Sequence, residues 1–427
     1  MIDSETISRK EVSSAYRNFV LVMLTLVYVF NFIDRQLLVI LQESIKEDLR
    51  LSDTQLGMLS GFTFAIFYVT MGIPIARLAD KSNRRNIVAI SLGLWSIMTG
   101  VSGLAKTFVH LLLARVGVGV GEAGGSPPAH AMISDYFPPG KRATALSFYS
   151  TGIYFGMLVG FLMGGYLNEA LGWRTAFFVL GIPGVVFSLL FYAFVKEPQR
   201  GAMDATASAI EKQSFFDVVK LLYSKPVFAF LSAATALHCF CIYGLLNWTP
   251  SFLSRVHGMS KTEIGVALGL ILGTTGAVGT FFGGYMTDRF GKADKSKYMT
   301  LPAYFILISI PFVIGAVFLK STVAVLICFG VSNFLYGTYL GPSINVAHSL
   351  VPASLRAITS AILFFMLNLV GLGFGPLVVG AISDALSADF GVESLRWAMS
   401  VVVIVSGAAA GMFLMGASRM GIANPKT

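Results

Sequence analysis

Charge is scarce in this sequence. Only 12% of the 427 residues are Asp, Glu, Lys or Arg, against roughly a quarter in an ordinary soluble domain, whereas 55% are hydrophobic. So few charges cannot cover the surface of a soluble protein of this size, which excludes soluble and disordered classes and predicts a polytopic membrane protein. The net charge of +9 then reflects basic residues retained on one side of a membrane, so we expect no nucleic-acid partner.

Cysteine is also rare. The three cysteines, Cys239, Cys241 and Cys328, fall inside apolar stretches, and no CxxC pair or His/Cys ligand spacing occurs, which argues against a disulfide framework or a metal centre. No nucleophile and base pair stands out, so we expect neither an enzyme nor a bound cofactor. Gly119–Gly124 matches GxGxxG, but no strand precedes it, as a dinucleotide site requires.

Long apolar stretches dominate the sequence. Twelve are long enough to cross the roughly 30 Å of hydrocarbon in a bilayer, which predicts an all-α membrane protein with two six-helix halves. The expected helices span 19–41, 55–79, 87–105, 107–133, 143–168, 173–195, 227–253, 262–286, 298–319, 322–350, 357–385 and 395–418.

Basic residues set the expected orientation. Most of the 31 lysines and arginines fall in alternate connections, which places both termini in the cytoplasm and the chain in the plasma membrane, or the inner membrane of a bacterium. We divide the chain into a cytoplasmic N-terminal segment (1–18), an N-terminal six-helix bundle (19–196), a cytoplasmic linker with a short amphipathic helix (197–226), a C-terminal six-helix bundle (227–418) and a cytoplasmic tail (419–427).

The two halves repeat one motif. ARLADKSNR follows the second apolar stretch, and GYMTDRFGK follows the eighth, so the halves are expected to be related by pseudo-two-fold symmetry, with a binding site between them. Acidic and basic residues at these turns predict ion pairs that clamp a cytoplasmic gate. The expected gate residues are Asp80, Arg84, Arg142, Asp288 and Arg289.

Four charges lie at bilayer depth. Asp34 and Arg35 occur in the first helix, and Arg115 and Glu122 occur in the fourth; such buried charges are costly and usually functional. Matching depth pairs Asp34 with Arg115, and the lean of side chains toward their helix N-terminus brings Arg35 toward Glu122. The glycines beside Glu122 are expected to let the first helix come close.

These features together resemble the major facilitator superfamily. That family usually has glycine where this chain has Asn83, and the turn can tolerate asparagine at a left-handed position. NFIDRQLL, LSDTQLGMLSG, GVGEAGGSPPAHAMISDYFPPGKRA and the later GWR and GIPG are similar to its spinster branch. That resemblance implies proton-coupled transport of lysophospholipids or sphingoid lipids by alternating access, with protons as the coupling ion and Asp34, Arg35, Glu122 and Arg115 at the coupling and headgroup positions.

The second half has few charges within its helices, which suits an amphiphile whose tail lies there. Its expected cavity residues are His238, Tyr243, Asn247, Trp248, Tyr336 and Asn368. We therefore expect a proton-coupled transporter of an amphipathic lipid that works in the bilayer as a monomer. A symporter of small organic anions and a broad-specificity drug/proton antiporter remain as alternatives.

Overall fold

The computed structural model describes residues 13–201, 215–352 and 355–422, and within them the chain is helical and contains no strand. Parts of four expected segments lie outside the described residues: 1–12 of the N-terminal segment, 202–214 of the linker, 353–354 of the C-terminal bundle and 423–427 of the tail.

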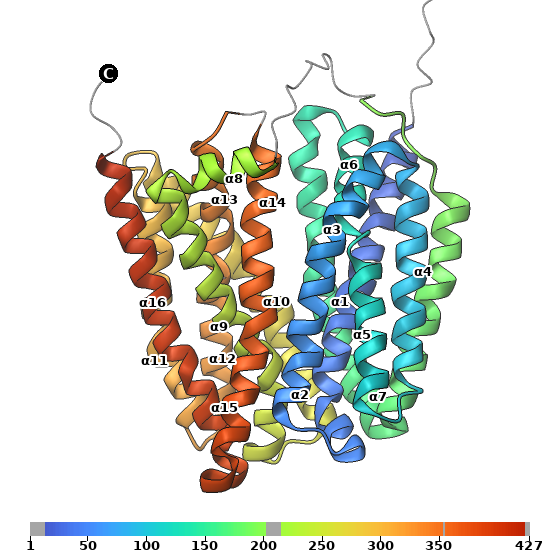
Figure 1. Cartoon of the computed structure of the whole chain (residues 1–427), viewed down its shortest axis with the longest axis vertical. Coiled ribbons are helices and arrows are strands. Elements are labelled where there is room, and N and C mark those ends of the chain that lie inside the picture. Colours follow the sequence, from blue (N-terminus) through green and yellow to red (C-terminus); the bar gives the residue numbers. More distant parts are fainter. Residues whose placement is uncertain (1–12, 202–214, 353–354, 423–427) are drawn as a thin grey trace, which may run out of the picture.

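The described residues form the twelve expected spans. Eight helices are long and apolar enough to cross a membrane, and two of them each contain two spans, joined at Gly172 (φ 80°) and at η5. α4 and the α5–α6 pair complete the set (Figure 1). The elements of the first half are α1 (Ser14–Leu49), α2 (Asp53–Gly57), η1 (Met58–Phe62), α3 (Thr63–Lys81), α4 (Arg84–Ser102), α5 (Phe108–Glu122), α6 (Ser126–Tyr136) and α7 (Pro139–Phe194).

The second half follows a short linker helix. Figure 1 shows α1 to α7 as one bundle and α9 to α16 as the other, with the start of α1 and the end of α16 at the same end of the molecule. The linker helix is α8 (Phe215–Tyr223). The elements of the second half are α9 (Pro226–His257), α10 (Lys261–Gly291), α11 (Lys297–Phe318), α12 (Thr322–Tyr336), η2 (Gly337–Tyr339), α13 (Leu340–Ser349), α14 (Arg356–Met366), η4 (Leu367–Phe374), α15 (Gly375–Phe390), η5 (Gly391–Glu393) and α16 (Ser394–Ile422).

The expected amphipathic linker helix is present as α8. It lies across the end of the second bundle (Figure 1) and buries Val218 and Leu222, which are four positions apart and therefore on one helix face.

The second and eighth spans begin alike. Ser52 with Gln55 forms a capping box at the start of α2, and Ser260 with Glu263 forms one at the start of α10. A capping box satisfies backbone N–H groups that the first helical turn leaves unpaired. The internal repeat therefore extends to the local chemistry of helix initiation.

Each of these helix starts also binds a carboxylate from the opposite half. Asp384 of α15 accepts hydrogen bonds from the backbone nitrogens of Asp53 (2.9 Å) and Thr54 (2.7 Å). Glu169 of α7 accepts one from the backbone nitrogen of Thr262 (2.8 Å). The positive end of a helix dipole favours such a negative charge, so both contacts hold the two halves together at the end where α2 and α10 begin.

Bare backbone forms the contact between α7 and α10, which we call the glycine seam (Gly165 and Gly265). A Cβ on Gly165 would come within 2.5 Å of the Lys261 carbonyl oxygen, and one on Gly265 within 2.5 Å of the Phe161 carbonyl oxygen. The two helices touch here because neither residue has a side chain.

The first part of α7 packs on α1 through glycines spaced four apart, which lie on one helix face. A Cβ on Gly156 would approach the Phe32 Cβ to 2.5 Å and the Val29 carbonyl oxygen to 2.7 Å. Both contacts are shorter than any ordinary van der Waals separation, and one of them is with rigid backbone. Close helix approach therefore depends on glycine at this position.

We expect Gly156→Ala to destabilise the protein by about 1–3 kcal/mol, the usual cost of overpacking, and to lower its thermal unfolding midpoint in detergent. Gly407→Ala is the matched control, because a Cβ there would meet nothing within 4 Å. A Gly156→Ala midpoint equal to that of the control would contradict the close packing of α1 and α7.

Candidate functional site

The fourth span, formed by α5 and α6, is broken just after Glu122. α5 begins with Thr107 as N-cap and ends at Glu122, and α6 restarts at Ser126 with proline in its first turn, where a missing N–H does no harm. Arg115 and Glu122 are 2% and 1% exposed. Two ionisable side chains of one span are thus fully enclosed, and each requires a partner.

Both predicted ion pairs are present. Arg35 Nε lies 2.8 Å from Glu122 Oε2, and Arg115 Nη1 lies 3.3 Å from Asp34 Oδ2. The expected depth of each charge in the bilayer and the tilt of side chains toward the helix N-terminus were therefore enough to identify the partners of all four charges.

The glycines beside Glu122 serve different neighbours from the one predicted. A Cβ on Gly119 would meet the Phe64 carbonyl oxygen of α3 at 3.0 Å, and one on Gly121 would meet the Trp95 nitrogen of α4 at 2.8 Å. The expectation that they admit the first helix was wrong. α1 needs no such gap, because Arg35 spans the distance with its long side chain.

The Asp34–Arg115 pair is enclosed by protein. Thr99 donates its hydroxyl to Asp34 Oδ1, and Arg115 Nη2 donates to the Ser102 hydroxyl at 3.4 Å. The Arg115 guanidinium also lies 6.0 Å from the Phe177 ring. These contacts fix both charges between α1, α4 and α5, which suits a structural pair.

The Arg35–Glu122 pair leaves bonding capacity unused. Arg35 bonds Glu122 through Nε alone, and its two terminal nitrogens make no hydrogen bond within the described residues. Glu122 Oε1 is buried and has no partner there. A buried carboxylate oxygen without a partner is costly, and a proton on Glu122 would remove its charge. The free nitrogens of Arg35 are separately open to a ligand.

Aromatic rings support Arg35 independently of Glu122. Its guanidinium carbon lies 5.1 Å from the Phe32 ring, 4.7 Å from the Phe64 ring and 5.1 Å from the Tyr68 ring. Each cation–π contact contributes about 0.5–2 kcal/mol. The cation therefore keeps favourable surroundings even when Glu122 does not hold it.

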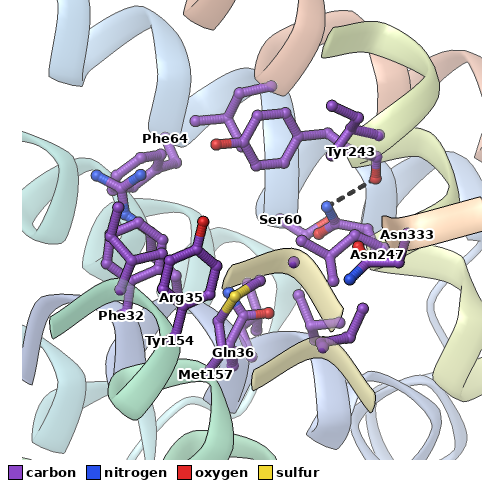
Figure 2. Close-up of a pocket in the computed structure, with 18 of the residues that line it drawn as sticks. Phe32, Arg35, Gln36, Ser60, Phe64, Tyr154, Met157, Tyr243, Asn247 and Asn333 are labelled. Carbon is purple, nitrogen blue, oxygen red and sulfur yellow. Dashed lines mark hydrogen bonds between the residues drawn. The ribbon is translucent and has the colours of Figure 1, made fainter. Parts of the chain in front are cut away.

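A cavity of about 210 Å³ between the two halves exposes Arg35 to a ligand. Figure 2 shows Arg35, Phe32 and Phe64 on one side of it, with Tyr243, Asn247 and Asn333 on the other. Polar side chains alternate with aliphatic and aromatic ones around the wall. The lining comprises Phe32, Arg35, Gln36, Leu38, Val39, Leu59, Ser60, Phe64, Arg115, Ile153, Tyr154, Met157, Ile242, Tyr243, Leu246, Asn247, Leu272, Gly276, Thr280, Asn333, Tyr336, Gly337 and Leu372.

Three of the six cavity residues that we predicted in the C-terminal bundle line the cavity. They are Tyr243, Asn247 and Tyr336. His238 and Trp248 do not line it, because they are fully buried among helices, where His238 Nε2 bonds the Tyr336 carbonyl oxygen (3.0 Å) and Trp248 Nε1 bonds the Pro376 carbonyl oxygen (2.8 Å).

Asn368 also lies outside the lining, because its side-chain nitrogen donates to the Phe364 carbonyl oxygen of its own helix (2.8 Å). The predicted set missed Tyr154, whose hydroxyl bonds the Thr280 hydroxyl across the two halves at 2.8 Å. Tyr154 lies two positions from Gly152 and Gly156, so it points away from the glycines that pack on α1 and toward α10.

The predicted gate residues lie at the end of the molecule opposite the glycine seam. Asp80 is in the last turn of α3, and Asp288 is in the last turn of α10. Asp288 Oδ1 accepts a hydrogen bond from the Tyr298 hydroxyl (3.0 Å). Arg289 Nη1 lies 3.5 Å from the Tyr285 hydroxyl, and Arg142 Nε donates to the Phe137 carbonyl oxygen (3.0 Å). Their role in gating stays a prediction.

Arg84 binds within its own half. It lies 2.6 Å from Asp135 and 2.7 Å from Glu197. Asn83, just before it, has φ −67° and caps α4 by accepting from the Asn86 nitrogen (3.0 Å). The expected left-handed conformation is therefore wrong, since asparagine serves here as an N-cap.

The end of the molecule where α2 and α10 begin carries a charge cluster that the sequence analysis did not predict. Arg255 of α9 donates to both carboxylate oxygens of Glu43 (2.8 and 2.6 Å) and to both of Asp53 (2.7 and 2.8 Å). Lys46 Nζ lies 2.5 Å from Asp53 Oδ1. One arginine thus joins two elements of the first half to the second half.

Known proteins match over nearly the whole chain. The family model for the Major Facilitator Superfamily matches residues 24–376. An MFS-type efflux pump of Mycolicibacterium smegmatis is 35% identical, over 92% of this chain and 90% of that protein. A hexuronate transporter of Bacillus subtilis is 27% identical, over 90% and 92% of the two chains.

A solved structure is also similar. A bacterial homologue of the human lysosomal transporter spinster, crystallised in an inward-facing and unoccupied conformation, is 32% identical and superimposes with a TM-score of 0.89, over 97% of this chain and 100% of that one. The twelve spans, the charge pairs within the first bundle and these matches agree. The chain belongs to the major facilitator superfamily of membrane transporters and resembles its spinster branch.

Proposed function

We propose that this protein couples proton movement to the transport of an amphipathic, lipid-like substrate of the lysophospholipid or sphingoid class, by alternating access. In this proposal the end carrying Asp80 and Asp288 faces the cytoplasm, the membrane is the plasma membrane or a bacterial inner membrane, and one chain works alone, because the site is complete within it.

One observation carries the proposal: Arg35 lies at the cavity wall with two free nitrogens, and Glu122, buried behind it, keeps an unpaired oxygen. When Glu122 is ionised, its carboxylate attracts Arg35 at 2.8 Å. When Glu122 takes up a proton, that charge attraction is lost and the guanidinium can bind a phosphate or carboxylate bidentately. Proton and substrate therefore act on the same cation, and coupling follows by linkage.

The wall composition favours an amphiphile. Among the residues that the structure describes, Arg35 and the enclosed Arg115 are the charged ones in the cavity lining, and most of the lining is aliphatic or aromatic. The volume of about 210 Å³ is below the 300–1,000 Å³ typical of sites that enclose a drug-sized ligand. In this state the cavity suits a headgroup and the first part of a chain.

Two alternatives rest on the similar proteins. The hexuronate transporter raises the prospect of a small organic anion, and the efflux pump that of an apolar drug. A hydrophilic anion requires paired polar groups around most of its surface, which the apolar walls of this cavity do not offer. A drug without an anionic group leaves the free nitrogens of Arg35 unused.

Thermal stabilisation of the purified protein separates these classes. A panel would contain lysophospholipids, sphingoid lipids, hexuronates and cationic drugs, because a ligand that binds only the folded state raises the unfolding midpoint. We expect the anionic or zwitterionic lipids to stabilise most strongly. Stabilisation by hexuronates or drugs alone would overturn the proposal.

Replacing Arg35 with lysine tests the headgroup contact. Lysine keeps the charge but loses the planar fork that binds an anion through two nitrogens. We expect Arg35→Lys to weaken binding of the best lipid about tenfold or more, measured by titration calorimetry, while binding of an uncharged long-chain alcohol stays the same. Undiminished lipid affinity would argue against contact between Arg35 and the headgroup.

A further inference from the structure

Three side-chain amides line the cavity, in addition to Arg35. They are Gln36 of α1, Asn247 of α9 and Asn333 of α12. Figure 2 shows Asn247 and Asn333 together on the side away from Arg35 and Phe64. The proposed coupling of Arg35 and Glu122 makes no use of these amides.

Hydrogen bonds fix which way two of the amides face. Asn247 Nδ2 donates to the Tyr243 carbonyl oxygen (2.9 Å), which can only accept. Asn333 Nδ2 lies 2.8 Å from the Thr275 hydroxyl, and that hydroxyl donates to the Ile271 carbonyl oxygen (2.8 Å), so it accepts from Asn333. A flipped amide would place oxygen against an acceptor in both cases. Both amide nitrogens are thus committed, and both oxygens face elsewhere.

Two acceptor oxygens at this wall are unpaired. Gln36 Oε1 and Asn247 Oδ1 are buried and have no hydrogen-bond partner among the described residues, in side chains that are 3% and 2% exposed as residues. An unpaired buried acceptor is destabilising until a donor reaches it. Both residues line the cavity, so a donor on a bound substrate is the group that could reach these oxygens after a local rearrangement.

We infer that Gln36 and Asn247 form a subsite that binds a hydrogen-bond donor of the substrate, an ammonium or a hydroxyl, while the anionic group of the same substrate lies on Arg35. The inference rests on the proposed function and narrows it. The transported amphiphile carries a donor close to its anionic group, which distinguishes it from a fatty acid or a plain alkyl phosphate.

Two matched phosphates test the subsite. One is a long-chain alkyl phosphate, and the other has the same chain with an amino group on the carbon next to the phosphate-bearing carbon; a third, with a hydroxyl there, distinguishes the two donors. We expect the purified full chain to bind the amino or the hydroxy compound about tenfold more tightly than the plain phosphate, the effect of one good hydrogen bond to a buried acceptor.

Gln36→Leu and Asn247→Leu should each reduce that preference to about twofold or less, because leucine has no acceptor. Asn168→Leu is the matched control. Asn168 is 3% exposed and its side-chain amide is equally unpaired, but it lies outside the cavity lining, so the preference should persist. Gln36→Glu nearly keeps the shape and adds charge, so it should increase the preference for the amino compound even if the leucine variants fold poorly.

The outcomes are distinct. If the wild type binds all three phosphates equally, or if the leucine and glutamate variants keep the wild-type preference, the subsite is refuted while the role of Arg35 stands. If the wild type binds none of them, the proposed function fails and the subsite fails with it.

Discussion

Glu122→Gln is expected to give a protein whose affinity for an anionic lipid no longer changes with pH. In the wild type, acid favours the protonated form of Glu122, which releases Arg35 from the 2.8 Å ion pair, so anion affinity should rise as the pH falls. Glutamine cannot ionise and leaves Arg35 in one state at every pH. The measurement is the dissociation constant of the best lipid over a pH series.

The same variant should abolish proton uptake. Linkage requires that a ligand bound more tightly by the protonated state draw protons onto the protein; a pH-indicator dye in weak buffer records this for the wild type. Glu122→Asp is the control, because it keeps a titratable carboxyl and should keep both effects. A pH-dependent affinity in Glu122→Gln would disprove the coupling scheme.

Arg255→Ala is expected to open the end of the molecule where α2 and α10 begin. The change removes four charge-assisted hydrogen bonds to Glu43 and Asp53 and leaves both carboxylates close together without their shared cation. Breaking a buried ion pair costs about 3–5 kcal/mol, which corresponds to a shift of about two orders of magnitude or more between conformations.

Spin labels across this end would record the shift. Glu47→Cys and Ser387→Cys place labels on exposed residues of the two halves, after the three native cysteines are replaced. The label distance should lengthen in Arg255→Ala and stay unchanged in Arg174→Ala. Arg174 also forms an ion pair, with Asp48, but both residues belong to the first half, so the pair does not join the two halves. An unaltered distance in Arg255→Ala would show that other contacts hold this end closed.

The sequence was most informative where burial left few choices. A charged residue within an apolar helix needs a partner, and Asp34, Arg35, Arg115 and Glu122 offered one level pair and one inclined pair, both present. That inference depends on an energy cost of unpaired buried charge that is large enough to exclude most alternatives.

Contacts between helix ends were beyond that reasoning. Arg255 follows an apolar stretch like any other flanking cation, and only the tertiary structure brings it to Glu43 and Asp53. The same limit explains the misplaced cavity residues. His238 and Trp248 lie on an inner helix, but periodicity does not decide whether such a side chain faces a cavity or a neighbouring helix, and here both bond carbonyl oxygens of their own half.

The glycine seam has a kinetic consequence. Gly165 and Gly265 meet as backbone, so these two residues have no side-chain rotamers to reset when α7 and α10 separate. Beside them, the Glu169 side chain accepts a single hydrogen bond from the Thr262 nitrogen. We therefore expect the rate of opening at this end to be limited by release of the Arg255 cluster, where several bonds must break together, rather than by the seam.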